Sequence, residues 1–338
     1  MKKLFNILLA VMLTIVCAFS LTACAVDDDD TTNKTGLIIS KNNKGEFVVR
    51  DFVYVDNYLD NGTLDIGAIL EEKGISSAKI SAGAFDGDDK IKTLIVSDKI
   101  VEIEQGAFRN MKSLETLEIP FVGKNAKADA KYDQTLETEG KATDKARTFS
   151  HFFGTTEYEK GRKMNNGFGD VYVPYTLKNV IVNATSNVDY TVAGKKEGYA
   201  IGYEAFKDAR ILQSITLKGN NLKEIGKDAF SGCTELKSLT LPSTIVTVYD
   251  NAFSGCTKLT DVTVLGTNVT LKNNVFSGCT AMNKINSGVN LTIDLANFVK
   301  IGEGAFDFDR QVEFNVRNSG TFDLDNIFGT TTYKTILG

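Results

Sequence analysis

The stretch that decides the fold is a hexapeptide that occurs three times with small changes. The copies read Ala229-Phe230-Ser231-Gly232-Cys233-Thr234, Ala252-Phe253-Ser254-Gly255-Cys256-Thr257 and Val275-Phe276-Ser277-Gly278-Cys279-Thr280, and successive copies are 23 residues apart. The phenylalanine recurs on both sides of them at steps of 22 to 30 residues, except for one gap between Phe108 and Phe206. Such regular self-similarity is typical of stacked repeats that bury one shared core.

Further apolar positions lie at fixed distances from this phenylalanine. An aliphatic residue stands five positions before it, and a unit such as Leu236-x-x-Leu239-x-Leu241-Pro242 begins six positions after it. The alternation in this unit predicts a short β-strand with its aliphatic side chains inward. We therefore predict a solenoid with a repeat of about 23 residues, one short parallel strand per coil and a column of phenylalanines.

The full pattern, I-x-x-x-A-F-x-x-C-x-x-L-x-x-L-x-L-P, resembles the BspA-like class of leucine-rich repeats of bacterial and protist surface proteins. The resemblance covers roughly residues 75–330 and is strongest over residues 201–280. It implies a leucine-rich-repeat solenoid and a role in binding or adhesion at the cell surface, with host matrix proteins as ligands of some members. It implies no catalytic activity and no cofactor.

The N-terminus has the features of a targeting signal. Residues 1–23 combine a charged start with a long apolar run, and the run ends in Leu21-Thr22-Ala23-Cys24, which resembles the lipobox of bacterial lipoproteins. The resemblance implies a bacterial surface lipoprotein whose Cys24 carries the lipid and holds the chain, extracytoplasmically, to a membrane. A plain secretory signal or an uncleaved anchor is the alternative. Residues 24–35 are acidic and polar, which predicts a solvated tether behind the lipid.

The remaining segments divide by how closely they follow the repeat. We predict an N-terminal cap over residues 36–75, with a hairpin around residues 42–45 and a helix over residues 64–73. The first repeats follow over residues 76–120, an insertion over residues 121–170, and the main repeat block with a C-terminal cap over residues 171–338. Within the long gap one repeat is recognisable, with Phe152-Phe153-Gly154 in the phenylalanine position and residues 174–182 as its strand.

Two groups of residues are candidate ligand contacts. The first is a ladder of polar residues between the inward aliphatics of consecutive strands, which would form a strip across the sheet: Thr216, Thr240, Thr263 and Asn286. The second is a set of tyrosines around the insertion, where projecting loops make good contact surfaces: Tyr158, Tyr172 and Tyr175. Each group has a purely structural alternative, because threonine is favoured in strands for steric reasons and tyrosines can pack an insertion onto its scaffold.

The sequence contains few residues in patterns typical of catalytic or metal-binding sites. His151 is the one histidine, which leaves no two-histidine metal site, and we expect it to be exposed or locally bonded. The cysteines of the repeat are expected to be buried thiols, with disulfides or a metal site as alternatives. The acidic residues that follow Phe85 and Phe306 are expected to cap turns, with calcium binding as the alternative.

Composition and charge limit the function classes further. The 42% hydrophobic and 24% charged residues are close to average globular usage. The formal charge of −5, with 36 basic and 43 acidic residues outside the leader, argues against a nucleic-acid partner. The sequence thus predicts a non-catalytic surface scaffold that binds a protein or glycan. A structural spacer without a ligand and a glycan hydrolase that uses acid pairs remain alternatives.

Overall fold

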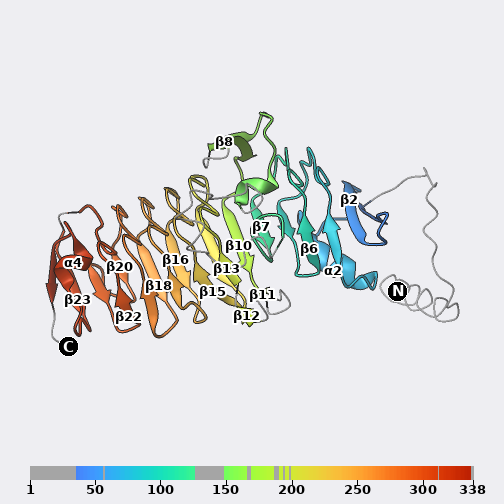
Figure 1. Cartoon of the computed structure of the whole chain (residues 1–338). Coiled ribbons are helices and arrows are strands. Elements are labelled where there is room, and N and C mark those ends of the chain that lie inside the picture. The colour runs from blue at the N-terminus through green and yellow to red at the C-terminus, as the bar shows by residue number, and fades with distance from the viewer. Residues whose placement is uncertain are drawn as a thin grey trace, which may run out of the picture. The chain divides into compact units, whose positions relative to one another are not determined.

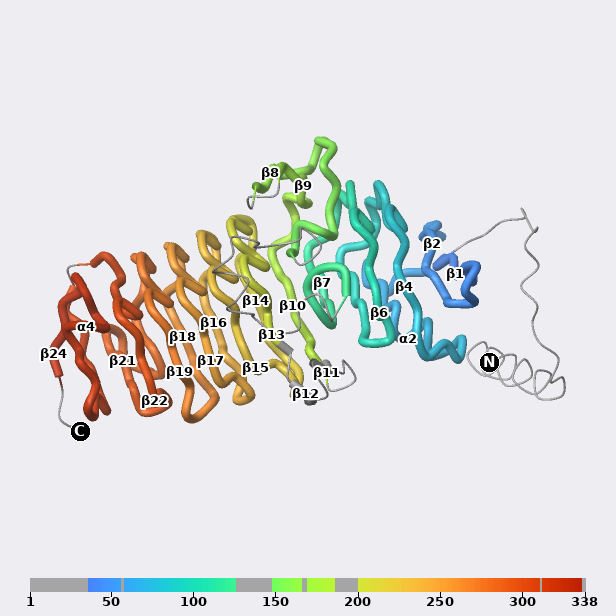
Figure 2. The backbone as a smooth tube through the Cα atoms, viewed as in Figure 1, coloured from blue at the N-terminus to red at the C-terminus, as the bar shows by residue number. Residues whose placement is uncertain are grey.

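The repeats stack as successive coils of a solenoid (Figures 1 and 2). The structure is a computed structural model that describes residues 36–55, 58–125, 148–165, 169–185, 190–192, 195–197, 199–310 and 312–335. All of these belong to one compact unit, Thr35–Gly338. The predicted signal peptide, Cys24 and the acidic tether lie outside the described residues, so the structure leaves them as predictions.

Each coil contributes one strand to a long sheet, as the alternation of the sequence predicts. The pairs in this sheet are parallel, and within the described residues it has 11 strands. Strand β16 shows why it forms, since Leu239 and Leu241 point into the core while Ser238 and Thr240 face solvent. In chain order the strands are β3 (Thr63–Asp65), β5 (Thr93–Ile95), β7 (Thr116–Ile119), β10 (Asn179–Asn183), β14 (Ser214–Lys218), β16 (Ser238–Leu241), β18 (Asp261–Val264), β20 (Lys284–Ile285), β21 (Thr292–Asp294), β23 (Phe314–Arg317) and β24 (Tyr333–Thr335).

The coils also carry a second strand, which corrects the expectation of one strand per coil. The aliphatic residue five positions before the phenylalanine ends this second strand, as Ile225 and Val248 do. Two shorter, mostly parallel sheets result, one at each end of the gap in the repeat. The first consists of β1 (Gly36–Lys41), β2 (Phe47–Val53), β4 (Ala78–Ile80) and β6 (Ile100–Ile103), and the second of β13 (Tyr199–Ile201), β15 (Leu222–Ile225), β17 (Thr247–Val248), β19 (Val269–Leu271) and β22 (Phe298–Ile301).

The phenylalanines form the predicted column. In the most regular part, the rings of Phe206, Phe230 and Phe253 are stacked with centroids 4.9 and 5.0 Å apart and planes within 9° of parallel. All of these rings are completely buried. Towards both ends the rings remain in contact but tilt, as between Phe306 and Phe328, whose centroids are 5.6 Å apart. The column confirms that neighbouring coils share one core.

Backbone hydrogen bonds and left-handed turns fix the alignment of each coil with the next. The Phe230 N–H donates to the carbonyl of Ala252 in the next coil at 2.7 Å, and Phe253 donates to Val275 at 2.9 Å. Asn251, two residues before Phe253, has a φ of 54°, and Gly255, two residues after it, has a φ of 70°. Asparagine and glycine tolerate this conformation better than other residues, which explains their places in the repeat.

Both ends of the solenoid are closed by irregular elements. The predicted hairpin is confirmed, because β1 and β2 pair antiparallel around residues 42–46. The predicted helix begins two residues late, as α2 (Ile66–Glu72), because residues 63–65 form the first strand of the long sheet and Asp65 caps the helix. At the other end, α4 (Leu324–Phe328) precedes β24. Among the described residues no helix is long and apolar enough to cross a membrane.

The gap in the repeat is bridged by a single coil. Strand β10 pairs with β7 on one side and β14 on the other, so only one rung separates them, as the sequence predicted. The 3-10 helix η3 (Phe149–Phe152) fills the column, with Phe152 5.5 Å from Phe108 and Phe149 5.0 Å from Phe206 between ring centroids. The predicted insertion therefore includes core residues. Residues 126–147 lie outside the described part.

His151 corrects an expectation. Its side chain is buried, at 4% exposure, and its Nε2 atom lies 2.9 Å from the carbonyl oxygen of Ile103 in the preceding coil. The expected exposed state is therefore wrong. The helix η3 turns the ring toward that coil, where the carbonyl offers a hydrogen-bond partner.

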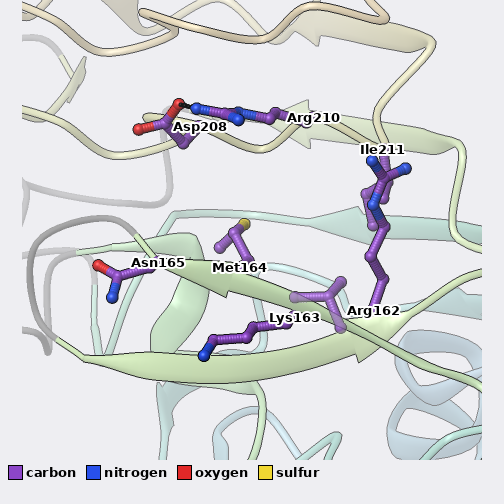
Figure 3. A pocket seen from close by; sticks show the side chains of 8 residues that line it. Arg162, Lys163, Met164, Asn165, Asp208, Arg210 and Ile211 are labelled. Carbon is purple, nitrogen blue, oxygen red and sulfur yellow. Dashed lines mark hydrogen bonds and ion pairs between the residues drawn. The ribbon is translucent and has the colours of Figure 1, made fainter.

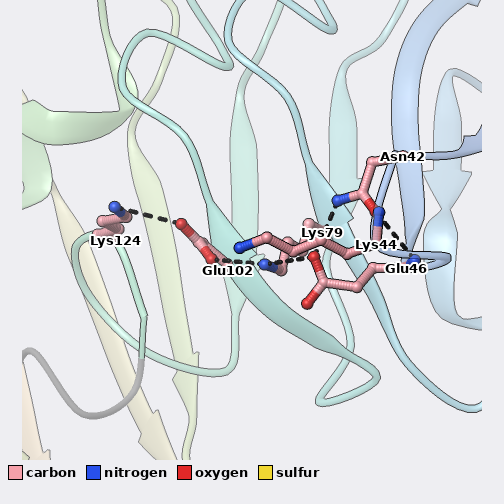
Figure 4. Close-up of polar contacts among 6 residues, drawn as sticks. All are labelled: Asn42, Lys44, Glu46, Lys79, Glu102 and Lys124. Carbon is pink, nitrogen blue, oxygen red and sulfur yellow. Dashed lines mark hydrogen bonds and ion pairs between the residues drawn. The ribbon is translucent and has the colours of Figure 1, made fainter.

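The first of the two shorter sheets, which contains β4 and β6, carries a charged ladder near the N-terminus (Figure 4). Lys79 of β4 lies 2.9 Å from Glu46 and 3.1 Å from Glu102 of β6, and Lys124 extends the ladder at 3.3 Å from Glu102. Hydrogen bonds from Asn42 and Lys79 lower the pKa of the Glu46 carboxyl, and those to Glu46 and Glu102 raise the pKa of the Lys79 ammonium. The ladder links the N-terminal hairpin to the first coils.

Candidate binding surface

The predicted threonines lie in line on the outer face of the long sheet. Thr240 of β16 and Thr263 of β18 are register partners, and Thr216 lies on the adjacent strand β14. All three side chains are exposed. Their aliphatic neighbours point inward, so the pleat fixes the direction of each hydroxyl.

A second column of small polar residues runs beside these threonines. Its register is continuous over five strands, from Thr93 to Thr116, Asn179, Ser214 and Ser238. Thr93, Thr116 and Asn179 were not predicted, although each directly precedes the first inward aliphatic of its strand. We call the two columns together the polar strip: Thr93, Thr116, Asn179, Ser214, Ser238, Thr216, Thr240 and Thr263.

Asn286 does not belong to the polar strip. It follows β20 with a φ of 53°, so the chain leaves the sheet at this residue. Its Oδ1 accepts a hydrogen bond from the Val264 N–H at 2.6 Å, and its Nδ2 donates to the carbonyl of Asp294 at 3.4 Å. The Asn286 side chain therefore hydrogen-bonds to backbone groups of neighbouring coils.

Charged pairs flank the polar strip. At its C-terminal side, Asp261 lies 3.4 Å from Lys284 on the next strand. Beside its middle strands, Lys218 of β14 lies 3.3 Å from Glu118 of β7, which also accepts a hydrogen bond from Asn183 at 2.9 Å. The strip is thus an uncharged band bounded by neutralised charges.

The three candidate tyrosines differ in exposure. Tyr158 packs against the solenoid and donates a hydrogen bond to the Met111 carbonyl at 3.3 Å, and burial raises the pKa of its hydroxyl above the ordinary value. Tyr172 is half-buried in β9 (Asp170–Pro174). Tyr175 is 60% exposed, and the Lys178 Nζ lies 4.3 Å from the centre of its ring. Of the three, Tyr175 presents its ring to solvent.

A groove lies between the insertion and the next coil (Figure 3). One wall is β8 (Gly161–Asn165), which forms an antiparallel hairpin with β9, and the other is the turn over residues 208–211. Its volume is about 290 Å³. In Figure 3 the Arg162 side chain reaches from β8 toward Ile211. We call this feature the basic groove, because its lining includes Arg162, Lys163 and Arg210.

The cations of the basic groove differ in how they are neutralised. Arg210 pairs with Asp208 at 2.7 Å, and Lys163 pairs with Asp170 at 2.6 Å. The part of the chain that the structure describes gives Arg162 no ion pair. The sequence does not predict this groove, because its two walls are about 45 residues apart along the chain and neither carries a motif.

The charge of Arg162 also acts on residues next to strands β10 and β16 of the long sheet. Lys178 directly precedes β10, and burial together with the positive charge of Arg162 lowers its pKa. A hydrogen bond from Lys258 lowers the pKa of Glu235, and the charges of Arg162 and Lys178 add to this shift. The carbonyl of Lys178 accepts from the Ser214 N–H of the polar strip at 3.1 Å.

The repeat cysteines are buried thiols. Cys233 donates from Sγ to the carbonyl of Phe206 at 3.2 Å, and Cys256 and Cys279 make the equivalent bonds at 3.3 Å. All three are free, so the disulfide alternative is wrong. Burial raises the pKa of the Cys279 thiol to about 12. Such thiols are neither reactive nor accessible.

The prediction that the acidic residues after the repeat phenylalanine cap turns is confirmed for Asp88 and Asp307 but not for Asp86. Asp88 accepts hydrogen bonds from the backbone N–H groups of Lys90 at 3.1 Å and Ile91 at 2.7 Å, and Asp307 accepts from the Asp309 N–H at 3.3 Å. Asp86 instead pairs with Arg109 at 2.7 Å. Within the described residues, no group of three histidine, cysteine or acidic side chains is placed to hold a metal ion. The arrangement of this surface offers polar contacts and charge.

The solved structures that match this chain include two leucine-rich repeat proteins and a vaccine antigen. A leucine-rich repeat protein of Bacteroides ovatus is 16% identical, with 90% of this chain and 76% of that chain covered and a TM-score of 0.33. A leucine-rich repeat protein of T. pallidum is 15% identical over 80% of this chain and 86% of that chain, with a TM-score of 0.36. The pneumococcal vaccine antigen PcpA is 18% identical over 77% and 65%, with a TM-score of 0.30.

Comparison with curated proteins gave no match. The model of one family, described as a BspA type leucine rich repeat region, matches six copies over residues 75–137 and 199–332. These ranges contain the phenylalanine column on both sides of the gap and leave out the hairpin of β8 and β9. The chain belongs to the BspA-type leucine-rich repeat family.

Proposed function

We propose that the protein is an extracytoplasmic scaffold that binds a protein or glycan ligand at the cell surface and catalyses no reaction. The polar strip carries this proposal, because five register-matched rungs hold its side chains in one plane. A rigid sheet that is already ordered before binding loses little entropy when a ligand docks. The hydroxyl and amide groups of the strip suit a hydrogen-bonding ligand.

Lysine in place of the outward threonines should remove this binding. In the double variant Thr240→Lys and Thr263→Lys, two charged side chains would cover the centre of the polar strip. We expect at least about tenfold weaker binding to those members of an array of matrix proteins and glycans that bind the native chain. The matched control places lysine at Thr247 and Thr270, which are register partners on strands β17 and β19 of the other shorter sheet.

The outcomes of this array separate the competing functions. Equal loss in both double variants would argue against the polar strip as the contact face. If the native chain bound nothing on the array, the spacer function would replace the proposal. Turnover of any glycan on the array by the native chain would overturn the non-catalytic proposal.

We also propose that Cys24 carries a lipid that anchors the scaffold to a membrane. Support comes from the sequence around Cys24, with its charged start, apolar run and small residues before the cysteine. Cells that express the chain should incorporate radiolabelled palmitate into it, and Cys24→Ser should abolish that label. Cys17→Ser is the control and should keep the label, because Cys17 would leave with the leader. Label that survives in Cys24→Ser would contradict the anchor.

A further inference from the structure

We propose that the basic groove binds a carboxylate of an acidic glycan whose chain continues along the polar strip. This inference rests on the proposed binding function and assigns it a ligand class and a second site. The groove stands out because the chain as a whole is acidic, with a formal charge of −5. Here, by contrast, three cationic side chains line one cavity of about 290 Å³.

Arg162 is the residue best placed to take the carboxylate. It has no ion pair among the described residues, whereas Lys163 and Arg210 are paired with aspartates. Its guanidinium offers parallel N–H donors that match the two oxygens of a carboxylate. A hydrogen bond between a guanidinium and a carboxylate is charge-assisted and therefore stronger than one between neutral groups.

Lys178 and Tyr175 extend the site toward the sheet. The Lys178 ammonium has a lowered pKa from burial and from Arg162, and a bound anion near both would relieve their mutual repulsion. The ring of Tyr175 is 60% exposed beside it. An exposed aromatic ring can stack on the apolar C–H face of a sugar. The Lys178 carbonyl accepts from the Ser214 N–H, and Asn179 of the polar strip directly follows Lys178.

The surface favours a glycan over an acidic peptide. Protein partners gain most of their affinity from apolar or aromatic anchors that fill desolvated pockets. Among the described residues, Tyr175 is the one large hydrophobic side chain of this hairpin and its neighbouring coil that is exposed, and the others lie elsewhere in the solenoid. The strip beside the groove consists of hydroxyl and amide groups, which pair with sugar hydroxyls.

The test measures binding of defined acidic glycans to the full-length chain in detergent. The probes are oligogalacturonate, hyaluronan fragments and oligosialic acid, with methyl-esterified oligogalacturonate as the neutral match and poly-glutamate as the acidic peptide. We expect at least one acidic glycan to bind, with an affinity that falls as salt rises. The methyl ester and poly-glutamate should bind at least about tenfold more weakly.

Five variants locate the site. Arg162→Glu and Lys178→Glu should each weaken binding by about tenfold or more, whereas Lys300→Glu, an equal change of charge on the exposed face of β22, should have little effect. Tyr175→Phe should bind like the native chain, and Tyr175→Ala should bind more weakly, since only the alanine removes the ring. Circular dichroism checks that each variant is folded.

The test separates a failure of the acidic-glycan inference from a failure of the scaffold proposal. If none of the three acidic glycans bound while the array gave a ligand sensitive to Thr240 and Thr263, the acidic-glycan inference would be overturned and the scaffold proposal would stand. Tighter binding of poly-glutamate would replace the glycan with an acidic peptide. Equal loss in Arg162→Glu and Lys300→Glu would show non-specific attraction and overturn the site.

Discussion

Replacing Phe253 by alanine should lower the free energy of unfolding by about 3–5 kcal/mol. Phe253 is completely buried and stacks between Phe230, at 5.0 Å, and Phe276, at 5.6 Å between ring centroids. Both neighbours are fixed by their own coils, so the column cannot close over the cavity that alanine would leave. Urea unfolding followed by circular dichroism measures the loss.

Two matched variants show whether the column is responsible. Phe253→Leu keeps most of the volume and should lose less than half as much stability as Phe253→Ala. Val299→Ala removes an exposed side chain and should change the stability by no more than about 0.5 kcal/mol. A loss below about 1 kcal/mol in Phe253→Ala would mean that the column does not hold the coils together.

Gly226→Ala should also be strongly destabilising. A Cβ atom on Gly226 would lie 2.7 Å from the carbonyl oxygen of Ile201 and 2.7 Å from the carbonyl carbon of Gly202 in the preceding coil. Both are backbone atoms, so they can yield only if the coils move apart. We expect a loss of about 2–3 kcal/mol, at the upper end of the effect of overpacking.

Gly288→Ala is the matched control for Gly226→Ala. No heavy atom lies within 4 Å of the position its Cβ would take. Because alanine restricts the unfolded chain more than glycine does, the stability should stay the same or rise by up to about 1 kcal/mol. If both variants lost the same stability, the close approach of coils at Gly226 would not explain the effect.

The sequence predicted those parts of the fold that repeat. The phenylalanine column and the long parallel sheet follow from the 23-residue spacing, since equal spacing places equal residues on successive rungs. The second strand of each coil was not predicted, because these strands are short and most bury only their end residues. Strand β17, for example, consists of Thr247 and Val248 alone, with only Val248 buried.

The features that depend on contacts across the gap escaped prediction. Phe149 completes the column and His151 contacts Ile103, but both lie in a segment without the repeat pattern. The polar strip was found where copies align without gaps, at Thr216, Thr240 and Thr263, and missed at Thr93 and Thr116. Asn286 has the right spacing, yet its left-handed conformation takes it out of the strand.

The distance between two labelled strands on either side of the gap tests the central claim that the coils stack directly. Spin labels at Thr93→Cys and Asp261→Cys, with Cys17 and Cys24 replaced by serine, can be measured by pulsed electron paramagnetic resonance. The repeat cysteines are buried and should remain unlabelled. The register chain from β5 to β18 passes through β7, β10, β14 and β16. Five steps of about 4.8 Å predict a backbone separation of about 24 Å.

The alternative arrangement predicts a clearly longer distance. The 98 residues between Phe108 and Phe206 exceed the length of four repeats, and four full steps there would make seven steps between the labels. That separation would be about 34 Å. A narrow distribution near 24 Å, allowing for the label arms, is the result that direct stacking predicts. A distribution centred near 34 Å, or one too broad to define a distance, would contradict it.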